Sequence, residues 1–323
     1  KQRERGKKSW KSGESGYEKI FEELSREAGV TGFKGYDADD TVSTVAIMHN
    51  MEKKVSTLKE GERGIVVTPE TTFYGEAGGQ VGDRGSIYAG ENTVFEVQDT
   101  KKFSNTILHL GVVKKGSVKE GDSVTLQVDS VRRNLTRANH TATHLLQASL
   151  KKIIGDHVQQ AGSLVEPDRF RFDFSHFKQM SDEEILAVED MVNRKIWENL
   201  PVETEVRQID EAIKMGAVAV FDEKYEDTVR VVKVDDFSME LCGGTHVDNT
   251  GKIGVFKILR EGSPGAGMRR IEAVTLKGIY ERFLAQQKIL DQLTGSLNVS
   301  EQAVPEKVHD ILEQNRALEK EMT

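Results

Sequence analysis

A series of short β-rich segments between Thr31 and about Val131 constrains the fold more than any other feature of this sequence. Residues of high β propensity fill five segments, and Gly, Asn and Asp turns separate them: TVSTVAIMHN, ERGIVVTPE, GSIYAGENTVFEVQD, SNTILHLGVVKKG and DSVTLQVDS. Short strands at regular spacing with turn residues between them are typical of a small antiparallel barrel. The pattern therefore predicts a β-barrel subdomain over residues 31–131.

A glycine-rich stretch, TTFYGEAGGQVGDRG, lies inside this interval. Glycine-rich loops bind phosphate when they end in Lys followed by Ser or Thr, because the lysine and the hydroxyl reach the phosphates and their metal ion. That ending is missing here, so the stretch is not interpreted as a phosphate-binding P-loop.

From Arg132 the pattern becomes α+β. The segment RRNLTRANHTATHLLQASLKKIIG is helical in character, and Ser181 with Glu184 three residues later forms the capping box that begins another helix. Strands are expected at SLVEPDRFRFDFSHF, PVETEVRQI, TVRVVKVD, KIGVFKILREG and RRIEAVTL. This order predicts an α+β core over residues 132–276, with helices on one side of a largely antiparallel sheet.

Helices are predicted at the start of the chain as well. In residues 1–30, Ile20, Phe21 and Leu24 share one helix face, and Gly29 occupies the position of a C-cap. The run Lys1–Lys11 is dense in Lys and Arg, which suits a solvated helix face as well as a basic patch for RNA. Because the chain starts with lysine and not methionine, a fragment with an unseen N-terminus is expected.

The last part of the chain, residues 277–323, is predicted to be helical too. Apolar residues step by three and four along it, with one asparagine in the series: Val308, Ile311, Leu312, Asn315, Leu318 and Met322. This spacing is typical of a coiled coil or a helical hairpin and suggests self-association. The repeat covers only about two heptads, so ordinary packing explains it nearly as well.

Composition excludes some classes of protein. No segment approaches the ~18 uncharged apolar residues of a membrane-spanning helix, and no signal peptide is recognised. The single cysteine, Cys242, rules out an intramolecular disulfide and fits a reducing, cytoplasmic protein. The net charge of −8 argues against RNA binding through overall charge, so an RNA partner would need local basic patches.

Two short pairs of residues carry the chemistry. His140 and His144 are four residues apart on a predicted helix, which places both imidazoles on one face, roughly 6 Å apart at the backbone. Cys242 and His246 flank a Gly-Gly turn that lets a thiolate and an imidazole converge. Three imidazoles and one thiolate suit tetrahedral zinc, so the spacing predicts one Zn²⁺ per chain. A free reactive thiol, or no site at all, stays open.

Competing mechanisms fit less well. A zinc protease of the HExxH type needs a glutamate after the first histidine, where this chain has Thr141. A Cys-His nucleophile pair would leave the HxxxH motif unexplained. Four protein ligands are typical of a structural zinc site, whereas Thr143, Gln160 and the Gly243-Gly244 turn offer uncharged polar groups that suit substrate recognition. The residues alone favour neither a structural nor a catalytic zinc site.

Several motifs taken in order resemble one family. RANHTATHLLQASL, HVQQAGSLV, ELCGGTHVDNTG and GSPGAGMRRIEAV resemble the editing domain of alanyl-tRNA synthetase. TTFYGEAGGQVGDRG, VQDT and VDSVRR resemble that family's small β-barrel, so the resemblance spans roughly Thr31–Leu276. The N-terminal helix is similar to the end of the family's tRNA-recognition domain, and the C-terminal helices to those leading to its oligomerising domain.

Two other groups share the zinc motifs. The editing domain of threonyl-tRNA synthetase has a bulkier, proline-containing turn at the position of Gly243, Gly244 and Thr245, and it lacks the barrel. The free-standing alanyl-tRNA editing proteins have both barrel and site, but they begin near the barrel. The helix that precedes the barrel here therefore favours a segment of the full synthetase.

The resemblance implies that the chain hydrolyses alanine tRNA mischarged with serine or glycine. It implies a cytoplasmic ATP-binding ligase as the parent protein; no ATP-binding motif of an aminoacylation core is recognised here, so only deacylation is expected. A non-catalytic, zinc-stabilised RNA-binding module is the alternative. The implied zinc ligands are His140, His144, Cys242 and His246.

Roles for other residues follow from the same resemblance. Gln160 and Thr143 are the implied catalytic-site residues, with Thr143 sensing the serine side chain, and Gly243 and Gly244 would contact substrate. Arg269 is implied to face the substrate or the tRNA end, although Pro264 in GSPGAGMRR departs from the family's usual Ile-Ala. A basic cluster for RNA binding is expected at Arg132, Arg133 and Arg137.

Overall fold

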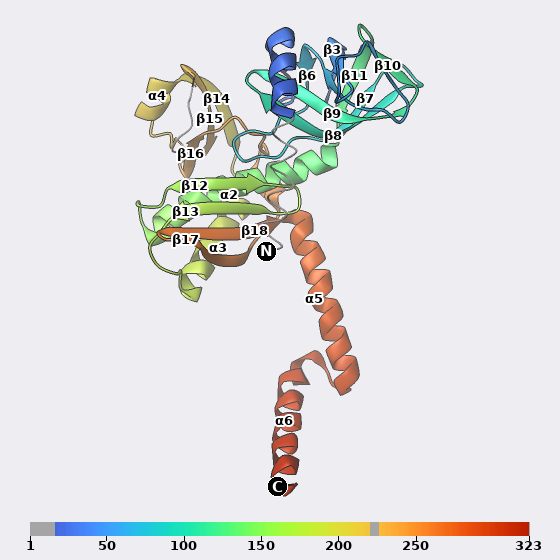
Figure 1. Ribbon diagram of the computed structural model, residues 1–323. Helices are drawn as coiled ribbons and strands as arrows, with labels where there is room; N and C mark the ends of the chain where they lie inside the picture. Colours follow the sequence, from blue (N-terminus) through green and yellow to red (C-terminus); the bar gives the residue numbers. More distant parts are fainter. Residues whose placement is uncertain (1–16, 220–225, 323) are drawn as a thin grey trace. The chain divides into compact units, whose positions relative to one another are not determined.

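The computed structural model describes residues 17–219 and 226–322 (Figure 1). The basic run Lys1–Lys11 lies outside the described residues. Contacts between residues divide the chain into two units, Lys1–Thr275 and Leu276–Thr323. The first unit holds every candidate site residue, and each unit is described by itself.

Residues 17–28 form the predicted N-terminal helix. It ends at Gly29, whose φ of 70° is the left-handed conformation that a C-cap glycine adopts, and whose N–H donates to the carbonyl of Ser25. Leu24 is fully buried against Ile47 and Ile65. The helix is therefore anchored to the following subdomain by its apolar face, as its sequence pattern predicts.

A curled antiparallel sheet of seven strands follows, in the order β2-β11-β7-β8-β9-β5-β3. Strands β2 and β3 are its two edges, and within the described residues no pairing between them closes the sheet. The predicted barrel is therefore a half-barrel. Its strands are β2 (Asp40–Thr44), β3 (Ile47–His49), β5 (Arg63–Val67), β7 (Gly85–Tyr88), β8 (Val94–Phe103), β9 (Thr106–Lys115) and β11 (Ser123–Val128).

Two small sheets complete this subdomain. Strands β1 (Gly32–Phe33) and β6 (Glu70–Thr71) are parallel, and β4 (Thr57–Lys59) pairs with β10 (Ser117–Lys119) in antiparallel register. The core of the half-barrel contains fully buried Met48, Leu58, Val66, Phe73, Ile87 and Phe95. The glycine-rich stretch connects β6 to β7, and of its residues only Phe73 belongs to this core.

The α+β core contains two antiparallel sheets where the sequence suggested one. The first has the order β12-β13-β18-β17, and the second β14-β15-β16. The first sheet contains β12 (Gln160–Val165), β13 (Phe170–Ser175), β17 (Phe256–Gly265) and β18 (Met268–Thr275). The second sheet and its connections contain β14 (Val202–Gln208), α4 (Ile209–Lys214), β15 (Thr228–Val234), β16 (Ser238–Leu241) and the 3₁₀ turn η1 (Thr250–Ile253).

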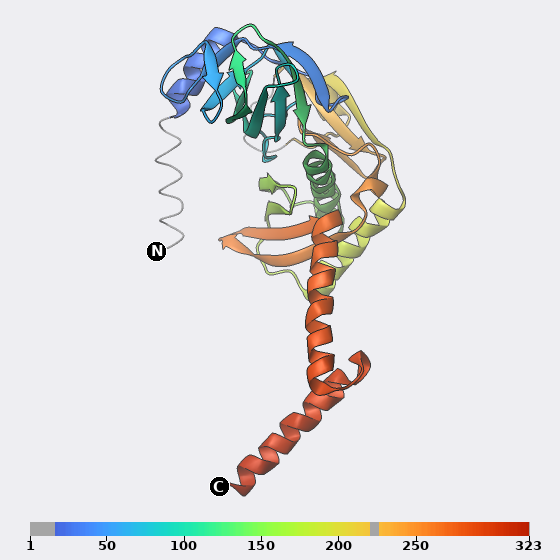
Figure 2. The same cartoon turned by 90° about the vertical axis from the view of Figure 1, so that its right-hand side faces the viewer.

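Helix α2 (Ser130–Ile154) explains why the sheet is divided. All residues from Ala138 to Gln147 are buried, so the helix is enclosed on every side over nearly three turns. It contacts β12, β13 and β18 of the first sheet and β16 of the second, and Figure 2 shows it between the half-barrel and the four-stranded sheet. An enclosed helix needs partners on several sides, which one flat sheet cannot supply.

Local capping signals place the helix ends. The side chain of Asp129 accepts a hydrogen bond from the N–H of Arg132 at the start of α2. Helix α3 (Asp182–Trp197) begins with the predicted capping box, in which Ser181 and Glu184 each bond the other's backbone N–H.

Arg133 joins the two subdomains. Its side chain is fully buried, and its guanidinium donates to the carbonyls of Gly35 and Thr72 and pairs with the carboxylate of Asp83. Asp83 also accepts a 2.7 Å hydrogen bond from the N–H of Tyr74. The helix that carries His140 and His144 is therefore tied to the loop between β6 and β7 by a buried ion pair.

Replacing Arg133 with leucine should lower the free energy of unfolding by about 3–5 kcal/mol, because the Asp83 carboxylate would stay buried without its cation. Urea unfolding measures this change. As a matched control, Arg26→Leu removes an exposed pair with Glu22 and should cost no more than about 1 kcal/mol. Equal losses in the two variants would refute the structural role of Arg133.

The second unit consists of α5 (Leu276–Leu297), the short 3₁₀ turn η2 (Glu301–Ala303) and α6 (Val304–Glu321), so the helical prediction is confirmed. Large apolar side chains are exposed on both helices, among them Tyr280, Phe283, Ile289, Leu312 and Leu318. Self-association through these helices stays a prediction. No helix in the described part of the chain is long and apolar enough to cross a membrane.

Candidate metal centre

The four predicted ligands come together in the first unit. His140 and His144 project from consecutive turns of α2, and Cys242 and His246 belong to the turn after β16. One potential ligand atom from each residue lies within 4.8 Å of the others. The Cys242 Sγ atom lies 3.4 Å from Nε2 of His140 and 3.3 Å from Nε2 of His246.

These distances fit a tetrahedral zinc ion. Zn–N and Zn–S bonds of about 2.1 and 2.3 Å place neighbouring tetrahedral donors roughly 3.6 Å apart. The imidazole centroids lie 4.3 to 5.5 Å from one another, so all three rings border one small space. The donor set and its spacing therefore suit a metal ion of the zinc type.

The histidines are held in the neutral form that binds metals. Burial, together with the nearby Arg230 guanidinium, lowers the pKa of His140 to about 3. Burial also lowers the pKa of His144 and of His246 well below the ordinary value, and the neighbouring imidazoles contribute. All three rings are therefore uncharged near pH 7 and can donate a nitrogen lone pair.

Gln80 of the glycine-rich loop orients His140. Its Oε1 accepts a 2.9 Å hydrogen bond from the N–H of Thr245 and lies 2.7 Å from Nδ1 of His140. Its Nε2 donates to the Thr245 hydroxyl. Because an accepting oxygen faces Nδ1, that nitrogen carries the proton, and the lone pair of Nε2 is left available to a metal ion.

Thr141 orients His246 in the same manner. Its hydroxyl donates to the carbonyl of Arg137 and so presents a lone pair to Nδ1 of His246, 3.1 Å away. The His246 Nδ1 therefore carries the proton and its Nε2 faces Cys242. Thr141, which stands where an HExxH protease has its catalytic glutamate, thus positions a histidine in this protein.

His144 has a buried ring nitrogen that fits a bound cation. Its Nδ1 atom is buried and has no hydrogen-bond partner within the described residues, which is the situation that a bound cation relieves. On its other side, the Glu240 carboxylate lies 3.7 Å from Nε2. Burial raises the pKa of Glu240 to about 7, and since the imidazole is neutral this contact is not an ion pair.

Two side chains hold the turn that carries Cys242. The Tyr36 hydroxyl donates to the carbonyl of Gly243 over 2.7 Å. The Arg230 guanidinium donates to the carbonyls of Cys242 and Gly244 and lies 4.2 Å from the centre of the Tyr36 ring. The turn is therefore fixed from both the half-barrel and β15.

The two glycines of the turn differ in their surroundings. A Cβ atom on Gly244 would overlap the His140 ring and lie 2.9 Å from Oε1 of Gln80, whereas a Cβ on Gly243 would have no atom within 4 Å. Of the two positions, only 244 requires a glycine, because its backbone packs directly against the His140 ring.

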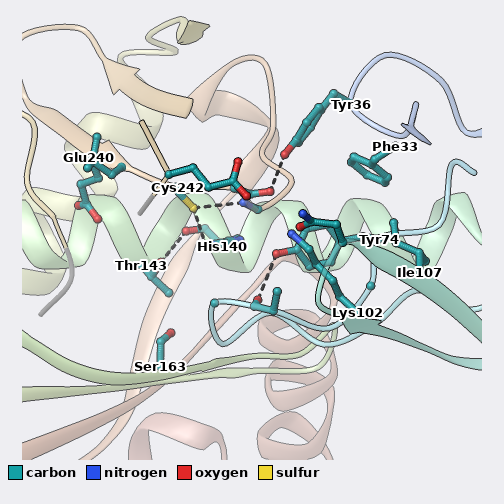
Figure 3. Close-up of a pocket in the computed structure, with 18 of the residues that line it drawn as sticks. Phe33, Tyr36, Tyr74, Lys102, Ile107, His140, Thr143, Ser163, Glu240 and Cys242 are labelled. Carbon is teal, nitrogen blue, oxygen red and sulfur yellow. Dashed lines mark hydrogen bonds between the residues drawn. The ribbon is translucent and has the colours of Figure 1, made fainter. Parts of the chain in front are cut away.

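A cavity of about 470 Å³ opens beside the metal centre (Figure 3). The predicted residues Thr143, Gln160, Gly243 and Gly244 all line it. The Thr143 hydroxyl donates to the carbonyl of His140 over 2.7 Å, so its oxygen lone pairs remain available to a ligand. The structure thus brings these predicted residues together at one cavity.

Arg269 lies elsewhere. It is on β18, which is separated from β12 by β13, and it forms a two-pronged ion pair with Glu261. It does not belong to the residues that line the cavity. The expected contact with substrate is therefore not supported by its position, because its charge is already used within the sheet.

The predicted basic cluster is also divided. Arg133 is fully buried and cannot meet a phosphate. Arg132 and Arg137 are half-buried near the start of α2, and Arg137 lies 3.5 Å from Asp39. Of the three arginines in this cluster, Arg132 and Arg137 keep part of their side chains exposed, and RNA binding by these two stays a prediction.

Sequence reasoning missed four residues that hold a candidate ligand or its turn: Tyr36, Gln80, Thr141 and Arg230. The signal for Gln80 was the glycine-rich stretch. Gly79 has a φ of 82°, and a Cβ there would lie 2.7 Å from the carbonyl oxygen of Ser163 in β12. Such glycines indicate that a backbone packs closely against another element, which is how Gln80 reaches the metal centre.

Comparisons with known proteins identify relatives. Residues 1–132 match the family described as tRNA synthetases class II (A), and residues 229–272 match the Threonyl and Alanyl tRNA synthetase second additional domain. An alanine–tRNA ligase of Caldicellulosiruptor saccharolyticus is 48% identical over 294 residues, and one of Idiomarina loihiensis is 47% identical over 290. Each match covers 90% of this chain and 33% of the relative. The chain therefore spans about a third of the length of these curated relatives.

Proposed function

This chain belongs to the alanyl-tRNA synthetase family, and from that premise we propose that its metal centre removes serine or glycine from mischarged alanine tRNA by ester hydrolysis. One observation carries the proposal. Three of the four clustered donors, His140, His144 and Cys242, line a cavity whose other polar groups are mostly uncharged, and His246 completes the cluster behind them. The parent protein is proposed to be a cytoplasmic alanine–tRNA ligase, with tRNA as its partner and no membrane association.

Physical chemistry explains why such an enzyme needs a second site. A pocket shaped for alanine admits glycine because glycine is smaller. It also rejects serine poorly, since apolar pockets separate substrates that differ by one small group only about 10- to 200-fold. A separate site that recognises the serine hydroxyl can select the seryl ester and leave the alanyl ester intact.

The residues of the chain fit distinct tasks in this reaction. A zinc ion held by the four ligands has no open coordination position, so it would hold the site in shape and orient the ester. Thr143 offers its hydroxyl lone pairs to the hydroxyl of a seryl group, a contact that alanine cannot make. Gln160, at the start of β12, presents an amide to the same cavity and is proposed to position the ester or the attacking water.

Thr143 gives the proposal a selective test. Thr143→Val should lower kcat/KM for seryl-tRNA about 5- to 150-fold, equivalent to the 1–3 kcal/mol of a hydrogen bond to a buried polar group. Glycyl-tRNA lacks the hydroxyl, so its hydrolysis should change by less than about threefold on the same reasoning. Steady-state deacylation of both tRNAs measures the two effects.

Thr136→Val is the matched control. Thr136 is buried in the same helix and donates to a backbone carbonyl, that of Arg132, but it does not line the cavity. This variant should hydrolyse both esters at the rate of the unchanged protein. Equal losses on seryl- and glycyl-tRNA in Thr143→Val would contradict the role of its hydroxyl in recognising serine.

A further inference from the structure

The wall of the cavity opposite the metal centre is aromatic and apolar. Phe33, Tyr36, Tyr74 and Ile107 line this wall; Figure 3 shows Phe33, Tyr74 and Ile107 on the side away from Cys242, and Tyr36 reaching the Cys242 turn with its hydroxyl. We call these four residues the aromatic wall. The two walls come from different subdomains, so the cavity has one polar, metal-ligating side and one flat, apolar side.

The rings of the aromatic wall are held in fixed positions. Phe33 makes perpendicular contacts with Tyr36 and Tyr74, with ring centroids 4.8 and 5.9 Å apart. The Tyr74 hydroxyl donates to the carbonyl of Ala77, and the Tyr36 hydroxyl to that of Gly243. Phe33 itself is only half-buried, so part of its ring is available to a ligand.

The shape of the substrate explains this second wall. An aminoacyl ester of tRNA joins the amino acid to the ribose of the terminal adenosine, so the adenosine must lie next to the ester wherever the ester is bound. Unpaired bases are held in proteins by stacking on aromatic side chains. The aromatic wall lies opposite the metal centre in the same cavity.

We infer that the aromatic wall binds the base of the terminal adenosine, with Phe33 as its main stacking partner. Lys102 also lines the cavity, and its ammonium group suits the phosphate on the 5′ side of that nucleoside. This inference rests on the proposed function, because it takes the 3′ end of an aminoacylated RNA as the ligand. It assigns binding of the nucleoside to the half-barrel and binding of the amino acid to the α+β core.

A stable analogue tests the inference without hydrolysis. The probe is 3′-amino-3′-deoxyadenosine 5′-monophosphate bearing serine through an amide, and its binding to the full chain is measured by isothermal titration calorimetry. Phe33→Leu keeps an apolar side chain but removes the flat ring, and should weaken binding about 5- to 10-fold, the lower part of the range for base stacking. Serine methylamide, which lacks the nucleoside, should bind the variant and the unchanged protein equally.

Phe177→Leu is the matched control, because Phe177 is 87% exposed and does not line the cavity. It should bind the analogue normally, and thermal unfolding verifies that both variants are folded. Unchanged affinity for the analogue in Phe33→Leu, or an equal loss in Phe177→Leu, overturns the inference.

Failure of this inference and failure of the proposed function give different results. If the unchanged protein hydrolyses seryl-tRNA and Phe33→Leu has the same KM, only the nucleoside assignment is wrong. If Phe33→Leu weakens binding of the analogue but the unchanged protein releases no serine, the nucleoside site stands and the editing function does not.

Discussion

Replacing Gly244 with alanine is expected to lower the affinity for zinc by on the order of 100-fold, the upper range for disturbing the support of a metal ligand. The added methyl group would overlap the His140 ring and crowd Oε1 of Gln80. His140 must then move, which breaks its hydrogen bond to Gln80 and displaces Nε2 from the other donors. Competition with a chromophoric chelator measures the change in affinity.

The neighbouring glycine supplies the control for this experiment. Gly243→Ala adds the same methyl group where no atom lies within 4 Å, and Gly243 does not have a positive φ. This variant should bind zinc with an affinity within about threefold of the unchanged protein, since an unstrained surface substitution costs no more than about 0.5 kcal/mol. Equal effects at the two positions would show that close packing against His140 is unimportant.

Cys242→Ser is expected to abolish stoichiometric zinc binding at micromolar protein. A serine hydroxyl stays protonated near neutral pH, so the site would lose its only anionic, soft ligand. Metal analysis after dialysis should give about one zinc per unchanged chain and nearly none per variant chain, as expected for a four-ligand site reduced to three neutral imidazoles.

Circular dichroism of the same samples separates a structural role for zinc from a chemical one. The ligands are carried by α2 and by a turn that Tyr36 and Arg230 already hold, so the variant should stay folded without the metal. Retention of a full equivalent of zinc by Cys242→Ser would show that the cysteine is not a ligand.

Features that depend on neighbouring residues were predictable from the sequence. The capping box of Ser181 and Glu184 and the C-cap at Gly29 are encoded within three or four residues, and the structure confirms both. The cluster that could hold a metal ion was predictable for a different reason, because three histidines and a lone cysteine in two spaced pairs have few alternative uses. Their residue types identified the site before any fold was known.

Features that depend on distant partners were not predictable. Arg133 looked like a surface cation because its charge is visible in the sequence, while its partner Asp83, fifty residues earlier, is not marked as buried. Gln80 and Tyr36 lie 165 and 207 residues from the turn residues that they bind. The opening of the barrel depends on the pairing of edge strands, which hydrophobic alternation does not specify.

The central claim is tested most directly by release of serine from seryl-charged alanine tRNA, with zinc-loaded protein at micromolar concentration. Alanyl-charged tRNA and the Cys242→Ser variant are measured beside it. The account predicts that serine is released, that alanine stays attached, and that the folded variant is inactive. Absence of serine release by the folded, zinc-loaded protein, or equal release by the variant, would contradict it.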